Sequence, residues 1–178
     1  MDWAGTPLIT LALAAGVVAL VWHAGHRVDR MHRRVDDAWG SLQLQLTRRA
    51  SAALDLAHAG LWDPVTSVVV AEAARAALAA PPWGGEHSEL SAALRTAAGD
   101  LAQVASDLED PDRGPLLREL AGVWYRALLA RRFLNEAVAT AVQLRSRRLI
   151  RYLRLAGPTP LPSSCDIDDV PPDGLIRQ

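Results

Sequence analysis

The chain has 178 residues, a formal net charge of −1 and a composition dominated by alanine, leucine and arginine. One phenylalanine and two tyrosines are few for a β-sandwich, so the composition favours helices. All 19 basic residues are arginine, which excludes a P-loop lysine, a Schiff-base lysine and a lysine general base, and a single cysteine excludes an intrachain disulfide and a thiolate zinc cluster.

An uncharged run from Trp3 to Trp22 opens the chain and leads into an arginine-rich segment. On a helix these two tryptophans would stand about 28 Å apart, close to the ~30 Å hydrocarbon thickness of a bilayer. A cleaved signal peptide is the alternative, but the bulky Trp22 stands where a cleavage site needs small residues. We therefore expect a single-pass anchor in the cell membrane over residues 1–25, with the rest of the chain in the cytoplasm because the positive flank lies on that side. The expected interface residues are Trp3, Trp22, Arg27, Arg30, Arg33 and Arg34.

After the anchor, apolar residues recur at spacings of three and four, the period of an amphipathic helix. Turn formers interrupt this pattern at Gly60, at PPWGG (residues 81–85) and at EDPDRGP (residues 109–115). Asp63 followed by Pro64 is a typical helix start. The expected helices cover residues 23–59, 64–80, 86–108 and 115–157.

Helix lengths and short loops determine the expected architecture. The first and last helices would be roughly 55 to 60 Å long and the middle two roughly 27 to 34 Å, and short loops make sequential helices antiparallel. The expected fold is all-α, with an N-terminal transmembrane helix that continues into an antiparallel four-helix bundle over residues 26–157. Three valines at residues 68–70 leave a short strand as an alternative, without a visible partner strand. The Pro/Asp-rich residues 158–178 are expected to form a flexible tail, largely unfolded or laid over the bundle.

Two segments resemble the signatures of the LemA family of membrane-anchored helical proteins. RVDDAWGSLQLQLTRR (residues 34–49) resembles the first signature, and LLARRFLNEAV (residues 128–138) resembles the second, with Leu134 in place of the usual tyrosine. After Arg49 the chain departs from the family pattern and lacks its proline. The resemblance implies an antiparallel helical bundle with one membrane span and no established enzymatic activity. The matching positions are Val35, Asp36, Asp37, Ala38, Trp39, Gln45, Leu46, Arg48 and Arg49, then Ala130, Arg131, Asn135, Glu136, Ala137 and Val138.

Polar residues within these signatures are the candidate functional residues. Antiparallel packing would place Glu136 near Arg48 and Arg49. A docking cluster is one interpretation; we favour the other, that these residues fix the register of the helices, as polar residues do in coiled-coil seams. The other expected pairs join Asp36 and Asp37 to Arg145 and Arg148. The polar seam comprises Asp36, Asp37, Trp39, Gln45, Arg49, Arg131, Asn135 and Glu136.

The last expected helix ends in a run of arginines. Such a run can bind anionic lipid, at about 1 kcal/mol per cation near a membrane surface, or RNA phosphates. We favour lipid, because the net charge of −1 is not that of a typical nucleic-acid binder. The run comprises Arg145, Arg147, Arg148, Arg151 and Arg154.

The sequence predicts no catalytic residue, metal site or cofactor. Asp36 and Asp37 are adjacent, so on a helix they point about 100° apart and do not share a substrate face. His23 and His26 lie one turn apart, but a metal would require further ligands. We therefore expect a non-enzymatic membrane scaffold or adaptor that docks a protein partner or self-associates. Lipid or nucleic-acid binding is the main alternative, and an enzyme with a pocket in the bundle is the remaining one.

Overall fold

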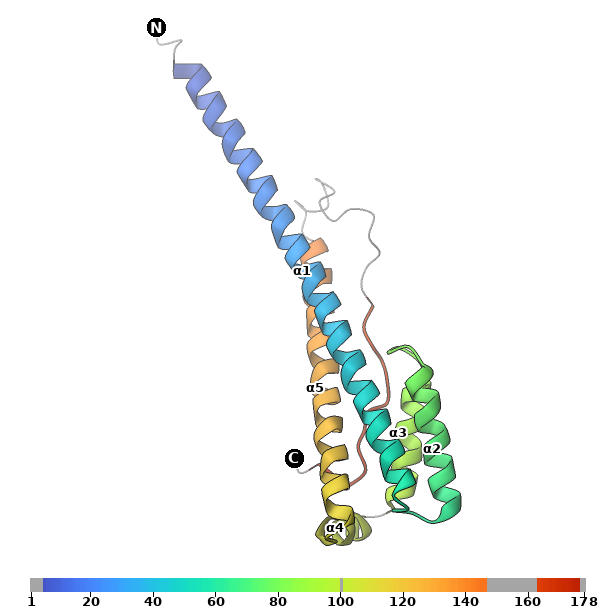
Figure 1. Cartoon of the computed structure of the whole chain (residues 1–178). Helices are drawn as coiled ribbons and strands as arrows, with labels where there is room; N and C mark the ends of the chain where they lie inside the picture. The colour runs from blue at the N-terminus through green and yellow to red at the C-terminus, as the bar shows by residue number, and fades with distance from the viewer. Residues whose placement is uncertain (1–4, 100, 147–162, 177–178) are drawn as a thin grey trace. The chain divides into compact units, whose positions relative to one another are not determined.

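The structure is a computed structural model that describes residues 5–99, 101–146 and 163–176 (Figure 1). These residues form five α-helices and contain no strand, which confirms the all-α prediction. The helices are α1 (Gly5–His58), α2 (Pro64–Ala79), α3 (Glu86–Ala98), α4 (Leu101–Glu109) and α5 (Arg113–Ser146).

Local sequence signals account for the C-terminal end of α1 and the start of α2. Gly60, which follows the end of α1, adopts a φ of 70°, a conformation that favours glycine. Asp63 caps α2, because its side chain accepts hydrogen bonds from the backbone N–H groups of Val65 and Thr66, and Pro64 occupies the first turn. The helix interpretation of the three valines is therefore confirmed.

The helix expected over residues 86–108 is divided, and this part of the prediction is wrong. Helix α3 ends at Ala98 and α4 begins at Leu101. Gly99 has a φ of 72°, in the left-handed region, which ends α3. The last helix, α5, begins at Arg113, where Asp110 Oδ1 accepts hydrogen bonds from the backbone N–H groups of Asp112 and Arg113.

The chain forms two compact units, and both α1 and α5 contribute to each. The first comprises residues 1–36 and 136–163, and the second comprises residues 37–135 and 164–178. Among the described residues, no helix is both long and apolar enough to cross a membrane, so the transmembrane part of the expected fold stays a prediction.

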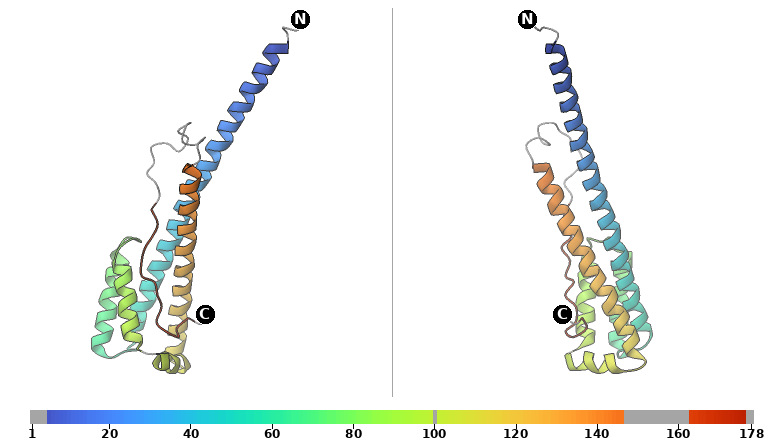
Figure 2. Two further views of the ribbon diagram at one scale, coloured as in Figure 1. Left: turned by 180° about the vertical axis from the view of Figure 1, so that it is seen from behind. Right: turned by 90° about the vertical axis from the view of Figure 1, so that its left-hand side faces the viewer.

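The second unit has a continuous apolar core. Trp124 of α5 is completely buried there, together with Leu90 and Leu94 of α3 and Leu56 of α1. A segment from the C-terminal end of the chain completes this unit, and Leu175 joins the core. In both views of Figure 2 this segment runs alongside α5.

Candidate functional site

The C-terminal segment, residues 164–176, crosses the second unit in an extended conformation. Cys165, Ile167 and Asp169 are buried, whereas the residues between them are exposed. This two-residue period is that of extended backbone. Of the two expectations for the tail, these residues show the second, a segment laid over the bundle. The reason is a set of directed polar contacts that a hydropathy pattern does not reveal.

Asp169 is the centre of these contacts. Its carboxylate accepts two hydrogen bonds from the Arg131 guanidinium, from Nε at 2.5 Å and from Nη2 at 2.9 Å. Its backbone carbonyl accepts a third from Trp124 Nε1 at 2.8 Å. Asp169 is only 5% exposed, so this two-point ion pair is largely shielded from water. The pair fixes both the position and the orientation of the segment on α5.

Arg49 of α1 supplies a second guanidinium in this region. It is completely buried, donates a hydrogen bond from Nη2 to the His87 carbonyl at 2.8 Å, and lies 4.9 Å from the centre of the Trp124 ring. Burial lowers the pKa of Arg49 to about 10, although the charges of Asp169 and Asp168 oppose that shift. The side chain stays charged at neutral pH. Asp169 thus offsets part of the cost of this buried cation.

Asn135 holds the segment at its other end. Its side-chain Nδ2 donates to the backbone carbonyl of Cys165 at 3.2 Å, and its Oδ1 accepts from the backbone N–H of Cys165 at 3.0 Å. The Cys165 thiol lies 3.5 Å from the Pro82 carbonyl, and burial raises its pKa. Cys165 is therefore a protonated, shielded thiol, which makes it a poor nucleophile.

Two residues of α3, Arg95 and Ser88, contact the segment at a more exposed position. Arg95 donates to both carboxylate oxygens of Asp168, at 2.5 Å and 3.2 Å, and to the Val170 carbonyl at 2.8 Å. Ser88 Oγ accepts a hydrogen bond from the backbone N–H of Asp168 at 2.9 Å. The side-chain hydrogen bonds from Arg95 hold the pKa of Asp168 below its usual range. Helices α3 and α5 therefore bind neighbouring residues of the same segment, Asp168 and Asp169.

Some buried polar atoms near Arg49 have no hydrogen-bond partner among the described protein atoms. They are Gln45 Oε1, Arg49 Nε and Nη1, and His87 Nδ1. Burial, followed by the charge of Arg49, lowers the pKa of His87, so its imidazole is neutral at pH 7.

The structure brings together three members of the expected polar seam, Arg49, Arg131 and Asn135, but with unexpected partners. Arg49 contacts a backbone carbonyl and an indole, Glu136 is exposed, and the expected pairing of Glu136 with Arg48 and Arg49 stays a prediction. The sequence analysis missed the other half of the site, which consists of Arg95, Trp124, Cys165, Asp168 and Asp169. The only available signal was the period-two alternation of apolar and acidic residues in CDIDD, a short and weak pattern.

Other predicted residues lie outside this site. Trp39 packs edge to face against Trp83, with ring centres 5.8 Å apart. Trp22, in the first unit, meets His26 in the same geometry at 4.6 Å. The exposed predicted residues are Asp36, Asp37, Arg27, Arg30, Arg33 and Arg34, and Arg145 is half-buried. Trp3, Arg147, Arg148, Arg151 and Arg154 lie outside the described residues, so their roles stay predictions.

Comparisons with known proteins supply no relative. No protein-family model, curated protein or solved structure matches the chain. Within the described residues, no three histidine, cysteine or acidic side chains gather in a way that suits a metal ion. The site is therefore interpreted from its own geometry, as a place where two helices hold an extended acidic segment.

Proposed function

We propose that this protein is a single-pass, LemA-type membrane scaffold or adaptor, non-enzymatic, whose bundle docks a protein partner or self-associates. The observation that carries the proposal is the exposure of apolar side chains in the N-terminal part of α1. Leu11, Leu13, Val18, Leu20 and Trp22 are between 57% and 70% exposed. A helix that is apolar on all sides is typical of a membrane span or of a buried element. The exposed state leaves this stretch without the apolar environment that its composition requires.

The arginines that follow support a cytoplasmic location for the bundle. Arg27, Arg30, Arg33 and Arg34 are exposed, as residues at a cytoplasmic membrane surface would be. The sequence resemblance to the LemA family points to the same arrangement of anchor and bundle. Membrane lipid is therefore one proposed partner, and the arginine run after α5 would add to that contact.

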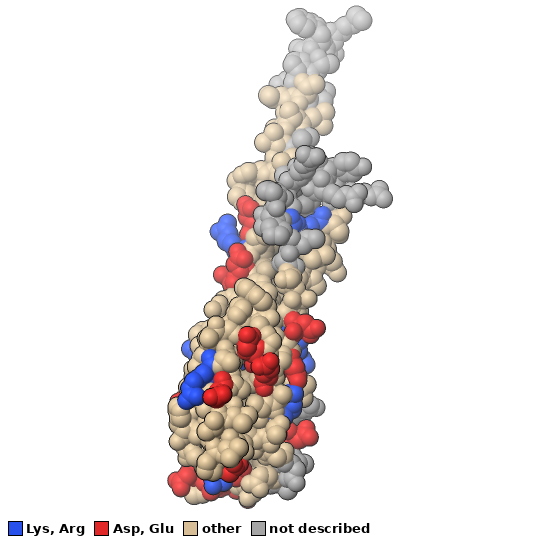
Figure 3. All heavy atoms as spheres, turned by 90° about the vertical axis from the view of Figure 1, so that its right-hand side faces the viewer, with Lys and Arg blue, Asp and Glu red and all other residues tan. Residues whose placement is uncertain are grey.

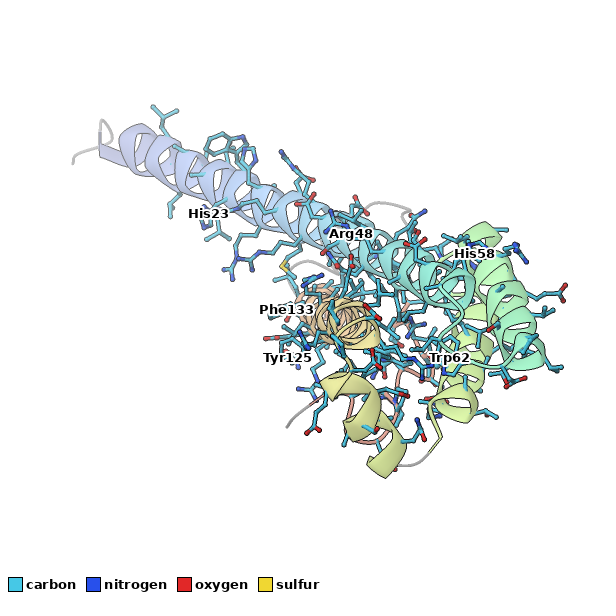
Figure 4. The ribbon with its side chains drawn as sticks, turned by 60° about the horizontal axis from the view of Figure 1, so that its bottom comes forward. His23, Arg48, His58, Trp62, Tyr125 and Phe133 are labelled. Carbon is cyan, nitrogen blue, oxygen red and sulfur yellow. The ribbon has the colours of Figure 1, made fainter. Side chains whose placement is uncertain are left out.

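The surface of the second unit supports an adaptor that binds protein. Val65, Val68 and Val69 of α2 are exposed, as are Tyr125 and Phe133, which point outward from α5 in Figure 4. On the face seen in Figure 3, acidic and basic side chains of the described residues are interspersed with uncharged surface. This mixed surface suits a protein partner better than a nucleic acid.

Membrane fractionation tests the anchor. We expect the full chain to stay in the membrane pellet after alkaline carbonate washing, and the Leu13→Arg/Val18→Arg variant to move to the supernatant, since each central arginine costs about 2.5–3.5 kcal/mol. The control variant, Gln43→Arg/Thr47→Arg, adds the same charges at exposed positions of the same helix. A wild-type chain that washes off contradicts the anchor. Detergent-solubilised protein that is strictly monomeric, with no co-purifying partner, contradicts the adaptor.

A further inference from the structure

The second unit holds its C-terminal segment in the manner of a peptide-binding protein. About half of its polar contacts reach backbone atoms of the segment: Asn135 pairs with both the N–H and the carbonyl of Cys165, and Trp124 donates to the carbonyl of Asp169. Ser88 and Arg95 contact the backbone on the other side. Backbone contacts of this kind fix an extended chain whatever its sequence. We call these four residues, Ser88, Arg95, Trp124 and Asn135, together with Arg131, which binds the Asp169 carboxylate, the tail-docking surface.

Selectivity comes from two carboxylates and two apolar positions. Arg95 and Arg131 each bind one carboxylate at two points, on the adjacent residues Asp168 and Asp169. Cys165 and Ile167 are buried at the preceding alternate positions. The surface is therefore expected to bind a five-residue pattern that matches residues 165–169: a small apolar residue, any residue, an aliphatic residue and two aspartates. Arginine pairs that bind neighbouring acidic groups are a common means of peptide recognition.

An empty tail-docking surface would be costly. Without Asp169, the Arg131 guanidinium would lose its carboxylate, and the fully buried Arg49 would lose the nearest charge that offsets its desolvation. Any occupant that replaces the segment must therefore bring a carboxylate to the same point. The segment buries the apolar side chains of Cys165, Ile167 and Leu175, and another acidic chain with apolar residues at these positions can reproduce both its apolar and its polar contacts.

We propose that the tail-docking surface is a recognition site for an extended acidic segment of a partner protein, with the pattern of residues 165–169, and that the chain's own C-terminal segment occupies it as a competitive inhibitor. Tethering gives the segment an effective concentration on the order of millimolar, so a partner gains access only when the segment is released or outcompeted. This inference states which kind of partner segment the proposed adaptor would bind. It depends on the second unit alone and does not require the membrane anchor.

The test uses the wild-type full chain and a synthetic peptide of residues 163–176 with Ser in place of Cys165. Because Cys165 is the only cysteine, its rate of alkylation reports release of the segment. We expect the peptide at millimolar concentration to accelerate alkylation several-fold, and a peptide that also carries Asp168→Asn and Asp169→Asn to have less than about a tenth of that affinity, since each charge-assisted hydrogen bond contributes about 1.5–3 kcal/mol. No acceleration, or equal acceleration by both peptides, overturns the proposal.

A second measurement uses a chain whose own segment is weakened. In the full-length Asp168→Asn/Asp169→Asn variant, we expect fluorescent wild-type peptide to bind at least about tenfold more tightly than it binds the wild-type chain. Circular dichroism establishes that the helices persist. Adding Arg131→Gln to this variant abolishes binding if the site is as described, whereas Arg132→Gln leaves it unchanged. A helical variant that fails to bind, or whose segment amides stay as protected as in the wild type, contradicts the proposal. Neither measurement is affected if the membrane anchor proves wrong.

Discussion

The two ends of the chain show opposite relations between composition and burial. In the N-terminal part of α1, Leu11, Leu13, Val18 and Leu20 are apolar and exposed. The C-terminal segment is rich in aspartate and proline, yet three of its five residues from Cys165 to Asp169 are inward-facing and buried. Average hydropathy therefore does not predict burial at either end, and it misses a segment that a few directed hydrogen bonds hold in place.

Arg131→Gln is the change expected to weaken the docking of the C-terminal segment most. It leaves the Asp169 carboxylate buried without its ion pair, so we expect a loss of about 3 kcal/mol in the free energy of unfolding measured in urea. The side chain of Arg131 is 24% exposed and that of Asp169 7%, which places the pair among shielded ones. Arg132→Gln is the matched control, since Arg132 is exposed on the same helix and should change stability by less than about 0.5 kcal/mol. Equal effects of the two variants contradict the role given to Asp169.

Asn135→Leu tests the contact at the other end of the segment. It leaves the backbone N–H and carbonyl of Cys165 without their side-chain partner, so we expect a loss of about 2 kcal/mol and faster alkylation of the thiol. Gln143→Leu, at an exposed position of the same helix, is the control. A variant that melts above the wild type would show that Asn135 does not stabilise this unit and would favour a docking role for its side chain.

Asp63→Ala separates general destabilisation from release of the segment. The change removes the cap of α2, whose backbone N–H groups at Val65 and Thr66 lose their acceptor, and should cost about 1 kcal/mol. Because Asp63 lies outside the tail-docking surface, we expect the alkylation rate of Cys165 under native conditions to change far less than in Arg131→Gln. An equal increase in the two variants would mean that the segment is released only by global unfolding.

A pH titration gives the smallest expected effect. The pKa of His87 is lowered in the folded state, mainly by burial, so the unfolded chain binds the proton more readily. Stability should therefore be complete above about pH 6.5, the ordinary pKa of histidine, and should fall as the pH decreases from there toward the folded-state pKa. Urea midpoints measured between pH 7.5 and pH 5.5 check this, with His87→Gln expected to reduce the slope. A wild-type midpoint that rises on acidification contradicts the assigned direction.

Much of the helical framework can be predicted from local signals, but the site cannot. Gly60, Asp63 and Pro64 act through their own backbone conformation and caps, so their effect is visible in the sequence. Gly99 has the same conformational freedom as Gly60, but it lacks a neighbouring proline or a longer turn motif, so the break between α3 and α4 was missed.

The site depends on contacts between residues far apart in the chain. Arg131 and Asn135 could be singled out by their resemblance to a family signature, but their partners lie 38 and 30 residues away, in a segment whose composition indicates disorder. Pairing of this kind follows from the path of the chain in space rather than from any periodic pattern. The sequence thus indicates Arg131 and Asn135 on α5 but not the partners that these residues contact.

Alkylation of Cys165 in the purified full chain tests most directly that the C-terminal segment is docked through its acidic residues. Cys165 is 1% exposed, and its pKa is raised by burial. We expect a membrane-impermeant maleimide to label the wild type at least about tenfold more slowly than the urea-unfolded chain, and labelling of Arg131→Gln to approach the unfolded rate while Arg132→Gln stays protected. A wild-type thiol that reacts as fast as that of the unfolded chain would contradict docking of the segment and, with it, the recognition site built on it.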